Sequence, residues 1–336
     1  MEKGRFRVWL ISGIVIFSAT LLVYAGMGYI KIPVKDVFEI LFNLDPEKVG
    51  MTEWVIVREV RLPRIAVSMI AGAALSLSGL VFQGVLLNPL ADPYTLGISA
   101  GASFGAALAI ILKLSFLGGF TVQLMAFVFA VISLSMVLKM ATFGGKINSV
   151  SLILSGVIIG AFFSAGLTFT KYIAGDEVAS IVFWLMGSFS SKTWGEALIM
   201  GVVTLLGLIV FIYYGEEMNI LSLGEKNALS MGVETSRVRK ILLVTASIIS
   251  AVSVSVCGII GFVGLIVPHL MRFLVGTDNK KLIFICAIWG AIILSAADNL
   301  VRSVLPNEIP IGIMTSLLGA PFFAFIFRKR LSGGRL

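Results

Sequence analysis

The sequence carries very little charge for its length. Only 13% of its 336 residues are Asp, Glu, Lys or Arg, whereas 58% are hydrophobic. Because a soluble domain contains about 25% charged residues, this composition excludes a water-soluble protein. Apolar runs of about 20 residues, the length at which a helix crosses the hydrocarbon core of a bilayer, recur along the chain. We therefore expect an all-α polytopic membrane protein with one transmembrane domain over residues 1–336.

Ligands for metals and partners for disulfides are also scarce. His269 is the only histidine, and Cys257 and Cys286 are the only cysteines. Neither cysteine belongs to a C-x-x-C pair, and each lies in an apolar run, as small buried hydrophobic residues do. A zinc site takes about four His, Cys or carboxylate ligands. We therefore expect no metal site and no disulfide in this chain.

A catalytic signature is missing as well. The phosphate-binding pattern G-x-x-x-x-G-K-[ST] does not occur in the sequence. We expect no catalytic residue, no bound cofactor and no ATP hydrolysis in this chain.

Ten apolar segments account for most of the residues. The expected membrane spans are 9–29, 62–83, 94–112, 118–140, 148–170, 193–214, 240–259, 262–275, 281–298 and 310–327. When the N-terminus is placed inside, Lys and Arg gather in the interior segments, for example at Arg5, Arg239 and Arg328. Lys and Arg near helix ends mark the cytoplasmic side. The distribution predicts cytoplasmic N- and C-termini, and it explains the net charge of +8 without nucleic-acid binding.

Two long polar segments interrupt the apolar pattern. Residues 31–61 form an external segment in this orientation, and residues 215–240 are the largest polar segment on the inside. Neither is a Ser/Gly-rich linker, so neither marks a second domain.

The segment N-P-L-A-D-P-Y-T-L-G at 88–97 breaks an apolar stretch with Pro89, Asp92 and Pro93. Proline cannot donate the backbone hydrogen bond of a helix interior, whereas Asp followed by Pro is typical of a helix N-terminus. We therefore predict a broken helix that restarts at Pro93 under an Asp92 cap.

Small residues spaced four apart form two strips along predicted helices. The first strip is Gly97, Gly101 and Gly105, and the second is Gly156, Gly160 and Ser164. Such strips let helix backbones approach closely in lipid. Two interpretations stay open: the strips serve helix packing alone, or they belong to a bundle that also opens a passage.

Several longer motifs resemble one family of membrane proteins. They are R-L-P-R at 61–64, A-G-A-A-L-S-L-S-G-L-V-F-Q-G at 71–84, N-P-L-A-D-P-Y-T-L-G-I-S-A-G-A at 88–102, G-F-V-G-L-I-V-P-H-L-M-R at 261–272 and L-P-N-E-I-P-I-G-I-M-T-S-L-L-G-A-P-F-F at 305–323. In this order they resemble the FecCD-type permeases, the membrane subunits of ATP-binding cassette (ABC) transporters that import iron-siderophores, haem and vitamin B12. The resemblance covers about residues 9–328.

The resemblance implies an architecture and a set of partners. It implies ten helices per subunit and a homodimer with its passage on the twofold axis, embedded in the lipid of a prokaryotic cytoplasmic (inner) membrane. Two cytoplasmic ATPase subunits, which bind ATP and Mg, and an external substrate-binding protein are the implied protein partners.

Residues 219–236 match the family's coupling segment, two short helices that sit in a cleft of the ATPase. The residues to which this match assigns a role are Gly224, Glu225, Ala228, Leu229, Gly232 and Val233. The two glycines would form turns, and the other four would face the ATPase. An ordinary solvated loop is the alternative, but a loop in water has no use for so many apolar residues.

Three arginines match positions that face the binding protein in the vitamin B12 branch of the family. They are Arg61, Arg64 and Arg302. Guanidinium groups suit carboxylates on a docking surface. Anchoring of these long side chains at the membrane surface is the alternative.

Ser149 and Val150 match the inner gate of the family. The vitamin B12 branch has two small hydroxyl residues there, so Val150 predicts a drier constriction. Gly156, Gly160 and Ser164 would line the passage further along the same helix, unless they serve packing alone.

The implied function is ATP-driven import of a metal chelate. A ferric siderophore is the first choice, followed by haem, cobalamin and molybdate. The alternative is an ion-coupled secondary transporter, a class that places carboxylates or broken helices near the bilayer midplane, whereas Asp92, Glu196 and Asp298 fall at the ends of the expected spans. A channel or scaffold is a third class, for which the sequence has no selectivity-filter pattern.

Overall fold

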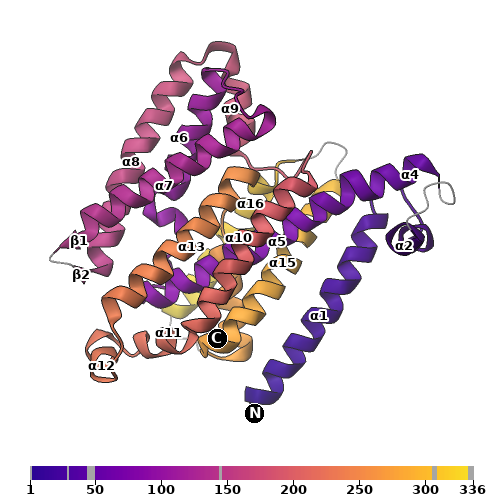
Figure 1. Ribbon diagram of the computed structural model, residues 1–336. Coiled ribbons are helices and arrows are strands. Elements are labelled where there is room, and N and C mark those ends of the chain that lie inside the picture. The colour runs from indigo at the N-terminus through magenta and orange to yellow at the C-terminus, as the bar shows by residue number, and fades with distance from the viewer. Residues whose placement is uncertain (1, 29, 44–49, 144–145, 305–308, 332–336) are drawn as a thin grey trace.

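The computed structural model describes residues 2–28, 30–43, 50–143, 146–304 and 309–331, and nearly all of them are helical (Figure 1). The α-helices are α1 (Glu2–Gly26), α2 (Val34–Asn43), α4 (Met51–Val55), α5 (Leu62–Leu86), α6 (Ile98–Ile111), α7 (Thr121–Ala141), α8 (Ser149–Ile173), α9 (Val178–Leu185), α10 (Trp194–Tyr213), α11 (Gly215–Leu221), α12 (Glu225–Ser230), α13 (Thr235–Cys257), α14 (Val263–Val275), α15 (Asn279–Val304) and α16 (Ile311–Leu331). Single turns of other helix types are η1 (Ile56–Arg61), η2 (Pro93–Leu96), η3 (Gly118–Phe120) and η4 (Gly175–Glu177). Within the described ranges the only strands are β1 (Thr142–Phe143) and β2 (Lys146–Ile147), which pair antiparallel.

Each of the ten predicted spans coincides with a helix. Among the described residues, seven helices are long and apolar enough to cross a membrane, and α6, α14 and α16 contain shorter apolar stretches. The 14 residues of α6 reach about 21 Å at 1.5 Å per residue, less than the roughly 30 Å hydrocarbon core. The predicted all-α membrane fold is confirmed, while the number of crossings and the side on which the termini lie remain predictions.

Helix α5 forms the centre of the bundle. It continues from α4 and η1, so that one helix runs over Met51–Leu86, and 83% of its most apolar window is buried inside the protein. α10, α13, α14 and α15 all pack against α5. A helix that is apolar on every side needs such complete burial or lipid contact, and here other helices supply it.

Pairs of glycines set the distance between α5 and two of its neighbours. A Cβ added to Gly79 would lie 1.9 Å from the carbonyl oxygen of Gly264 in α14. A Cβ added to Gly72 would lie 2.2 Å from the carbonyl oxygen of Gly290 in α15. The backbones of these helices therefore touch directly, which is the kind of contact that associates helices in lipid.

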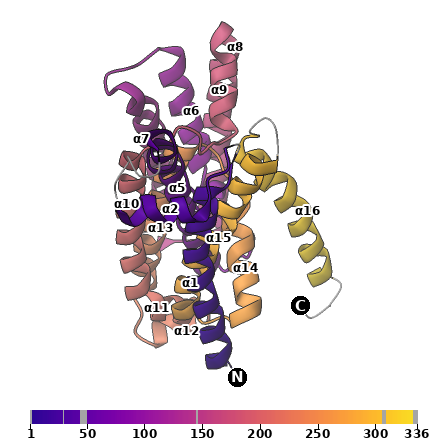
Figure 2. The ribbon, with the colours of Figure 1, turned by 90° about the vertical axis from the view of Figure 1, so that its right-hand side faces the viewer.

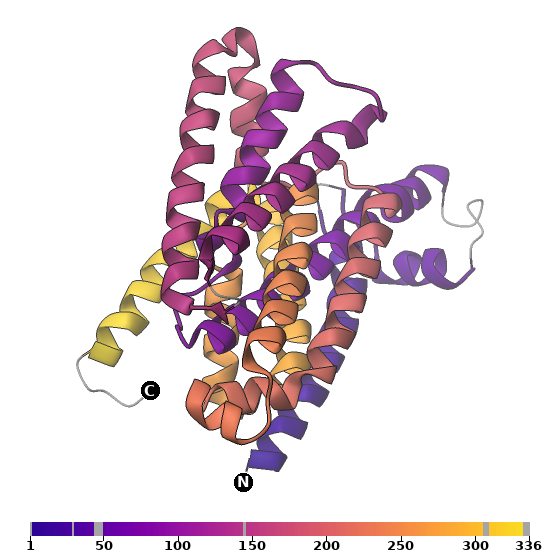
Figure 3. The same cartoon turned by 60° about the vertical axis from the view of Figure 1, so that its left-hand side comes forward.

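Helices α6, α7 and α8 form a second group beside this centre (Figures 1 and 3). Gly101 and Gly105 face α7 so closely that an added Cβ would lie 2.6 Å from the Phe129 oxygen and 2.4 Å from the Met125 oxygen, respectively. The Ser133 hydroxyl donates to the Gly97 carbonyl at 2.9 Å. The first glycine strip thus lies in a helix-packing contact.

The N-terminal basic residues and the polar segment 215–240 lie at the same end of the bundle. The first turns of α1 and the short helices α11 and α12 share the lower end in Figures 1 and 2, and α16 descends toward it. This arrangement agrees with the predicted grouping of residues 215–240 with the N-terminal basic residues. Residues 44–49 of the predicted external segment and residues 305–308 of the last motif lie outside the described residues.

We expect Gly79→Ala to destabilise the protein, because the added methyl group would force α5 away from Gly264. Overpacking of this kind costs about 1–3 kcal/mol and should lower the thermal unfolding midpoint measured in detergent. Gly84→Ala in the same helix is the matched control, since its Cβ would meet only the ends of the Met218 and Asn279 side chains at 3.6 and 3.9 Å. Equal midpoints for the two variants would contradict the close crossing.

Candidate transport and coupling sites

The interruption after α5 is a structured segment with its own hydrogen bonds. Asp92 accepts hydrogen bonds from the backbone N–H groups of Tyr94 at 2.8 Å and Thr95 at 3.1 Å. The predicted Asp92 cap of a helix starting at Pro93 is therefore confirmed. The Tyr94 hydroxyl donates to the Ile260 carbonyl at 2.8 Å, so the first interruption is tied to the gap between α13 and α14.

The gap between α13 and α14 is held by backbone contacts with the end of α9. Gly258 adopts φ +74°, and a Cβ there would lie 2.4 Å from the Trp184 carbonyl oxygen. Because both the conformation and the space exclude a side chain, glycine is required at this position. The Ser188 N–H donates to the Cys257 carbonyl at 2.8 Å, which satisfies one of the last carbonyls of α13.

The start of α16 joins the same place. The N–H groups of Ile311 and Gly312 donate to the carbonyls of Gly187 and Met186 at 3.1 and 3.0 Å. Three backbone segments therefore meet at one place, which we call the backbone junction: residues 184–188, 257–262 and 310–312.

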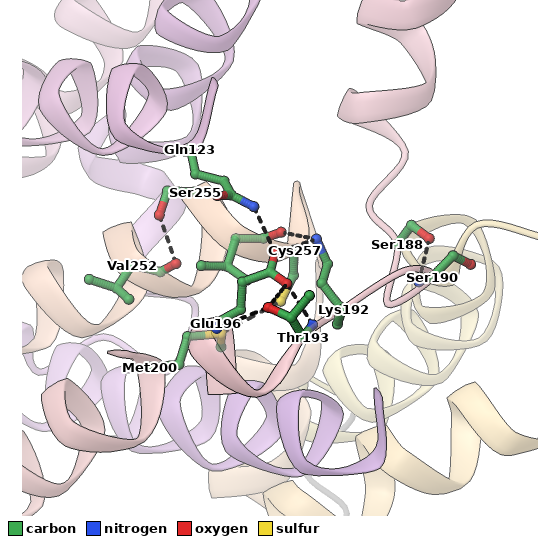
Figure 4. Close-up of polar contacts among 11 residues, drawn as sticks. Gln123, Ser188, Ser190, Lys192, Thr193, Glu196, Met200, Val252, Ser255 and Cys257 are labelled. Atoms are coloured by element: carbon green, nitrogen blue, oxygen red, sulfur yellow. Dashed lines mark hydrogen bonds and ion pairs between the residues drawn. The ribbon is translucent and has the colours of Figure 1, made fainter. Parts of the chain in front are cut away.

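A buried polar cluster braces this junction (Figure 4). Lys192 Nζ donates to the Val256 carbonyl at 2.6 Å and to Glu196 Oε1 at 3.3 Å. Gln123 Nε2 donates to the same carboxylate oxygen at 2.7 Å. The Lys192 and Glu196 side chains are only 13% and 6% exposed. A cation at a helix C-terminus stabilises that helix, so the cluster fixes the end of α13 against α7 and α10.

Part of this cluster has a local signal in the sequence, which lies outside the family motifs quoted above. Thr193 and Glu196 form a capping box at the start of α10, in which each side chain accepts from the backbone N–H of the other residue. The T-x-x-E spacing before an apolar run is the pattern of such a box. The contacts to Gln123 and Val256, in contrast, join distant parts of the chain and have no local signature.

A cavity of about 470 Å³ lies against the backbone junction. It is lined by Leu185, Met186, Ile259, Gly261, Gly312, Ile313, Ser316 and Leu317. Irregular backbone inside a membrane is tolerated where protein surrounds it or where it lines a cavity, and both conditions hold here. This makes the junction a candidate element of a transport pathway.

Helix α8 carries the residues predicted as the gate. It begins at Ser149 under an Asn148 cap, whose side chain accepts from the Val150 N–H at 2.8 Å. Val150 is exposed on this helix. At 100° per residue, Leu154, Val157 and Ser164 lie on the same exposed face as Val150, which is therefore the face that α8 presents away from its own chain.

Two of the predicted passage residues lie on a different face of α8. A Cβ on Gly156 would lie 2.2 Å from the Thr95 carbonyl oxygen, and a Cβ on Gly160 would lie 3.6 Å from the Gly97 Cα. Both glycines therefore pack against η2 and the start of α6. This favours the packing interpretation for Gly156 and Gly160, while Ser164 is exposed; a passage along α8 stays a prediction.

The side chains of Arg61 and Arg64, two of the three arginines predicted to dock a binding protein, form hydrogen bonds inside the fold. Arg61 and Arg64 are 5% and 8% exposed. Arg61 donates to the Ala25 carbonyl at 2.8 Å and also to Ile30, and Arg64 binds both carboxylate oxygens of Asp298 at 2.9 Å. These contacts support a structural role for Arg61 and Arg64, and their docking to a binding protein stays a prediction.

Arg302 differs from these two arginines in being half-buried. It donates to the Tyr24 carbonyl at 2.7 Å and to Asn299 Oδ1 at 2.8 Å. Its role in docking stays a prediction.

The segment 215–234 forms a compact helical projection, which we call the α11–α12 projection. Gly224 adopts φ +96° before α12, and Gly232 adopts φ +81° after it. The Gly232 and Val233 N–H groups donate to the carbonyls of Leu229 and Ala228, each at 3.0 Å. This is the hydrogen-bond pattern of a Schellman motif with glycine in the left-handed position, so both glycines mark turns between short helices.

The outward face of the projection differs from the predicted one. Ala228 and Val233 are buried, and the Glu225 carboxylate pairs with Arg239 at 3.0 Å. The predicted facing residues Ala228 and Val233 thus lie inside the projection, whereas Leu229 is exposed and the Glu225 side chain is 50% exposed despite its pair with Arg239. Exposed instead are Leu223, Leu229 and Met231, at 58%, 55% and 56%, and we call these three the apolar patch.

The projection is fixed to the start of α15. Asn219 of α11 donates to Asp278 Oδ1 at 2.9 Å and accepts from the Asn279 N–H at 2.8 Å. Burial alone would raise the pKa of Asp278, but hydrogen bonds from Asn219, Lys281 and the Lys280 N–H together lower it. The ionised carboxylate is therefore favoured, and it holds α11 against the α14–α15 turn. A cavity of about 770 Å³ opens beside this contact.

The described part of the chain contains no group of three or more His, Cys, Asp or Glu side chains placed to hold a metal ion. Cys257 and Cys286 are both buried and unpaired with each other.

Comparison with known proteins identifies the chain. A match to the FecCD transport family covers residues 14–329. An ABC transporter permease of Bacillus subtilis, itself uncharacterized, is 37% identical over 100% of this chain and 97% of its own length. The cobalamin import system permease of Halobacterium salinarum is 40% identical over 83% of this chain and 75% of its own length. A solved metal-chelate type ABC transporter in an inward-facing conformation has a TM-score of 0.83 at 32% identity, covering 96% of this chain and 99% of that one.

Together with the helical bundle, these matches define the class as a polytopic membrane subunit of an ABC transporter. The chain belongs to the FecCD transport family, which confirms the resemblance found in its sequence motifs. Its predicted function as an ABC permease is likewise confirmed, and the alternative of an ion-coupled secondary transporter is not supported.

The Arg64–Asp298 pair gives a direct test of the buried arginines. We expect Arg64→Ala and Asp298→Ala each to lower the free energy of unfolding by about 3–5 kcal/mol, because each leaves the other charge buried without its partner. The double variant should be less destabilised than the sum of the two, which a double-mutant cycle in detergent measures. Arg237→Ala, which removes an exposed pair at 3.7 Å, is the control and should cost less than about 1 kcal/mol. If Arg64→Ala were as stable as this control, the structural role of Arg64 would be refuted.

Proposed function

We propose that this permease imports a metal chelate that an external binding protein delivers. The observation that carries the proposal is the match of 96% of the chain to a metal-chelate type ABC transporter. The relatives named for cobalamin, molybdate, hemin and iron(3+)-hydroxamate all act on a compound that contains a transition metal. A ferric siderophore is the first choice of substrate, followed by haem, cobalamin and molybdate.

The working unit in this proposal is a homodimer in a prokaryotic cytoplasmic membrane, with the passage between the two copies of α8. The exposed face of α8 supports this, because Ser164 and Thr168 interrupt its apolar side chains. Small residues such as Ser and Thr are enriched where helices meet in lipid, and the Thr168 hydroxyl donates to the Ser164 carbonyl at 2.9 Å. Ser149 and Val150 would form the inner constriction at the start of the same helix.

Two ATPase subunits, which bind ATP and Mg themselves, would dock on the α11–α12 projection of the dimer. The apolar patch supports this assignment. It places three exposed apolar side chains within residues 223–231, and such a patch is unfavourable in water and typical of a protein contact. In this proposal the projection lies in the cytoplasm.

Helix α13 would carry movement from the ATPase to the transport pathway. It starts beside the projection, where Arg239 pairs with Glu225, and ends at Cys257 in the backbone junction. Its 23 residues span about 34 Å. Because the projection is also fixed to α15 through Asn219, a displacement of α12 would reach both α13 and α15 rather than being lost in a loop.

We expect the double variant Leu229→Asp/Met231→Asp to lose its ATPase partner during affinity purification from native membranes in mild detergent. Loss of central apolar contacts costs about 2 kcal/mol or more at a protein interface, which corresponds to roughly thirtyfold weaker binding. The unsubstituted chain should retain the ATPase in about stoichiometric amount. Phe116→Asp/Leu117→Asp, which places the same two charges at exposed apolar residues in the α6–α7 connection, is the matched control.

Retention of the ATPase by the double variant would remove the apolar patch from the proposal. Failure of the unsubstituted chain to retain any ATPase would instead contradict the proposed assembly.

A further inference from the structure

Helix α2 divides its surface into three arcs. At 100° per residue, Val37, Ile40 and Leu41 form one apolar arc, and Val37 and Ile40 are fully buried. This arc packs with Ala25 of α1 and Ile65 of α5 in a small separate core. One side of α2 is therefore occupied by the protein.

A second apolar arc of α2 is exposed with respect to the residues that the structure describes. Val34, Phe38 and Phe42 recur every four residues and are 56%, 53% and 71% exposed. The two phenylalanine rings lie together with their centroids 4.5 Å apart. A helix on a water-exposed surface would carry polar residues at these positions.

The third arc of α2 is polar. It contains Lys35, Asp36 and Glu39, and Lys35 approaches Glu39 at 4.0 Å. One third of the helix circumference thus packs against protein, one third suits apolar surroundings, and one third suits water. This three-way division distinguishes α2 from a helix that lies between protein and water only.

The direction of α2 fits the plane of a bilayer. Figure 1 views α2 nearly along its axis, whereas α1 lies in the plane of the picture, and Figure 2 shows α2 lying across the direction of α1. α1 is a candidate membrane span. A helix perpendicular to a spanning helix at its end lies parallel to the membrane surface.

Aromatic residues mark the same level of the bundle. A cavity beside α2 is lined by Ile40 and Leu41 together with Arg58 and Trp194, and Arg58 stacks on the Trp54 ring with its guanidinium carbon 5.2 Å from the ring centroid. Trp and Arg collect where hydrocarbon meets headgroups. Val23 and Met27, near the end of α1, are exposed apolar residues as well.

We propose that α2 is an interfacial helix whose Val34–Phe38–Phe42 face is embedded in the bilayer at the C-terminal end of α1, the outer leaflet in the proposed orientation. The exposed apolar arc lies in the hydrocarbon boundary, and the polar arc lies among headgroups and water. The arc of Val37, Ile40 and Leu41 packs against α1 and α5 and fixes the helix there. The helix thereby holds the start of the long α4–α5 helix at a defined depth. This proposal does not depend on the substrate or on the ATPase.

Depth measurements on the full-length chain in phospholipid nanodiscs test the proposal. Nitroxide spin labels are placed at Phe38→Cys and Phe42→Cys, and on the polar arc at Lys35→Cys and Glu39→Cys as matched controls. The native cysteines are buried, and the unsubstituted chain gives the background. Each label is exposed to oxygen, which partitions into lipid, and to a water-soluble nickel chelate.

The expected ratio of oxygen to nickel accessibility at positions 38 and 42 is several-fold higher than at 35 and 39. A label at Val15→Cys, an exposed residue in the middle of α1, supplies the value for lipid. Equal ratios at all four α2 positions would show a helix in water and overturn the proposal. Exclusion of both reagents from 38 and 42 would show that protein, such as a second copy of the chain, covers the face, and it would overturn the proposal as well.

Discussion

Direct contact between helix backbones is the interaction on which the rest of this structure depends. Lipid tails are as apolar as leucine, so the hydrophobic effect does not drive helices together inside a bilayer. At Gly72 and Gly79 the backbone of α5 touches the backbones of α15 and α14. α10 and α13 pack around the same helix. The position of every broken segment is therefore set relative to α5.

The close packing of α5 is what allows interrupted helices elsewhere in the bundle. Each interruption leaves backbone N–H and carbonyl groups that cost several kcal/mol if they remain unpaired in hydrocarbon. Tyr94, Lys192 and Ser188 satisfy carbonyls at or beside the gap between α13 and α14. The backbone junction is consequently rigid in its hydrogen bonding and still bordered by a cavity. α13 joins this junction to the α11–α12 projection, and the proposed coupling to an ATPase rests on this connection.

Much of the fold could be predicted from local sequence. Apolar runs fix where helices form, Asp92 before Pro93 fixes a helix start, and Gly224 and Gly232 fix turns, because each of these effects acts within a few residues. The face that a residue presents was harder to predict. Gly156 is expected to line a passage, whereas it packs against the Thr95 carbonyl of a segment distant in sequence. Ala228 is expected to face a partner, whereas it is buried. Arg64 likewise finds Asp298 across 234 residues, a contact that no local pattern indicates.

ATP-driven uptake into sealed vesicles tests the central claim most directly. The chain is reconstituted with the ATPase that purifies with it, and uptake of labelled iron, haem, cobalamin and molybdate compounds is measured with the binding protein supplied outside and ATP enclosed inside. The account predicts that uptake of one of these compounds requires ATP and persists when proton and sodium gradients are collapsed. Uptake that follows an ion gradient in the absence of ATP would contradict it.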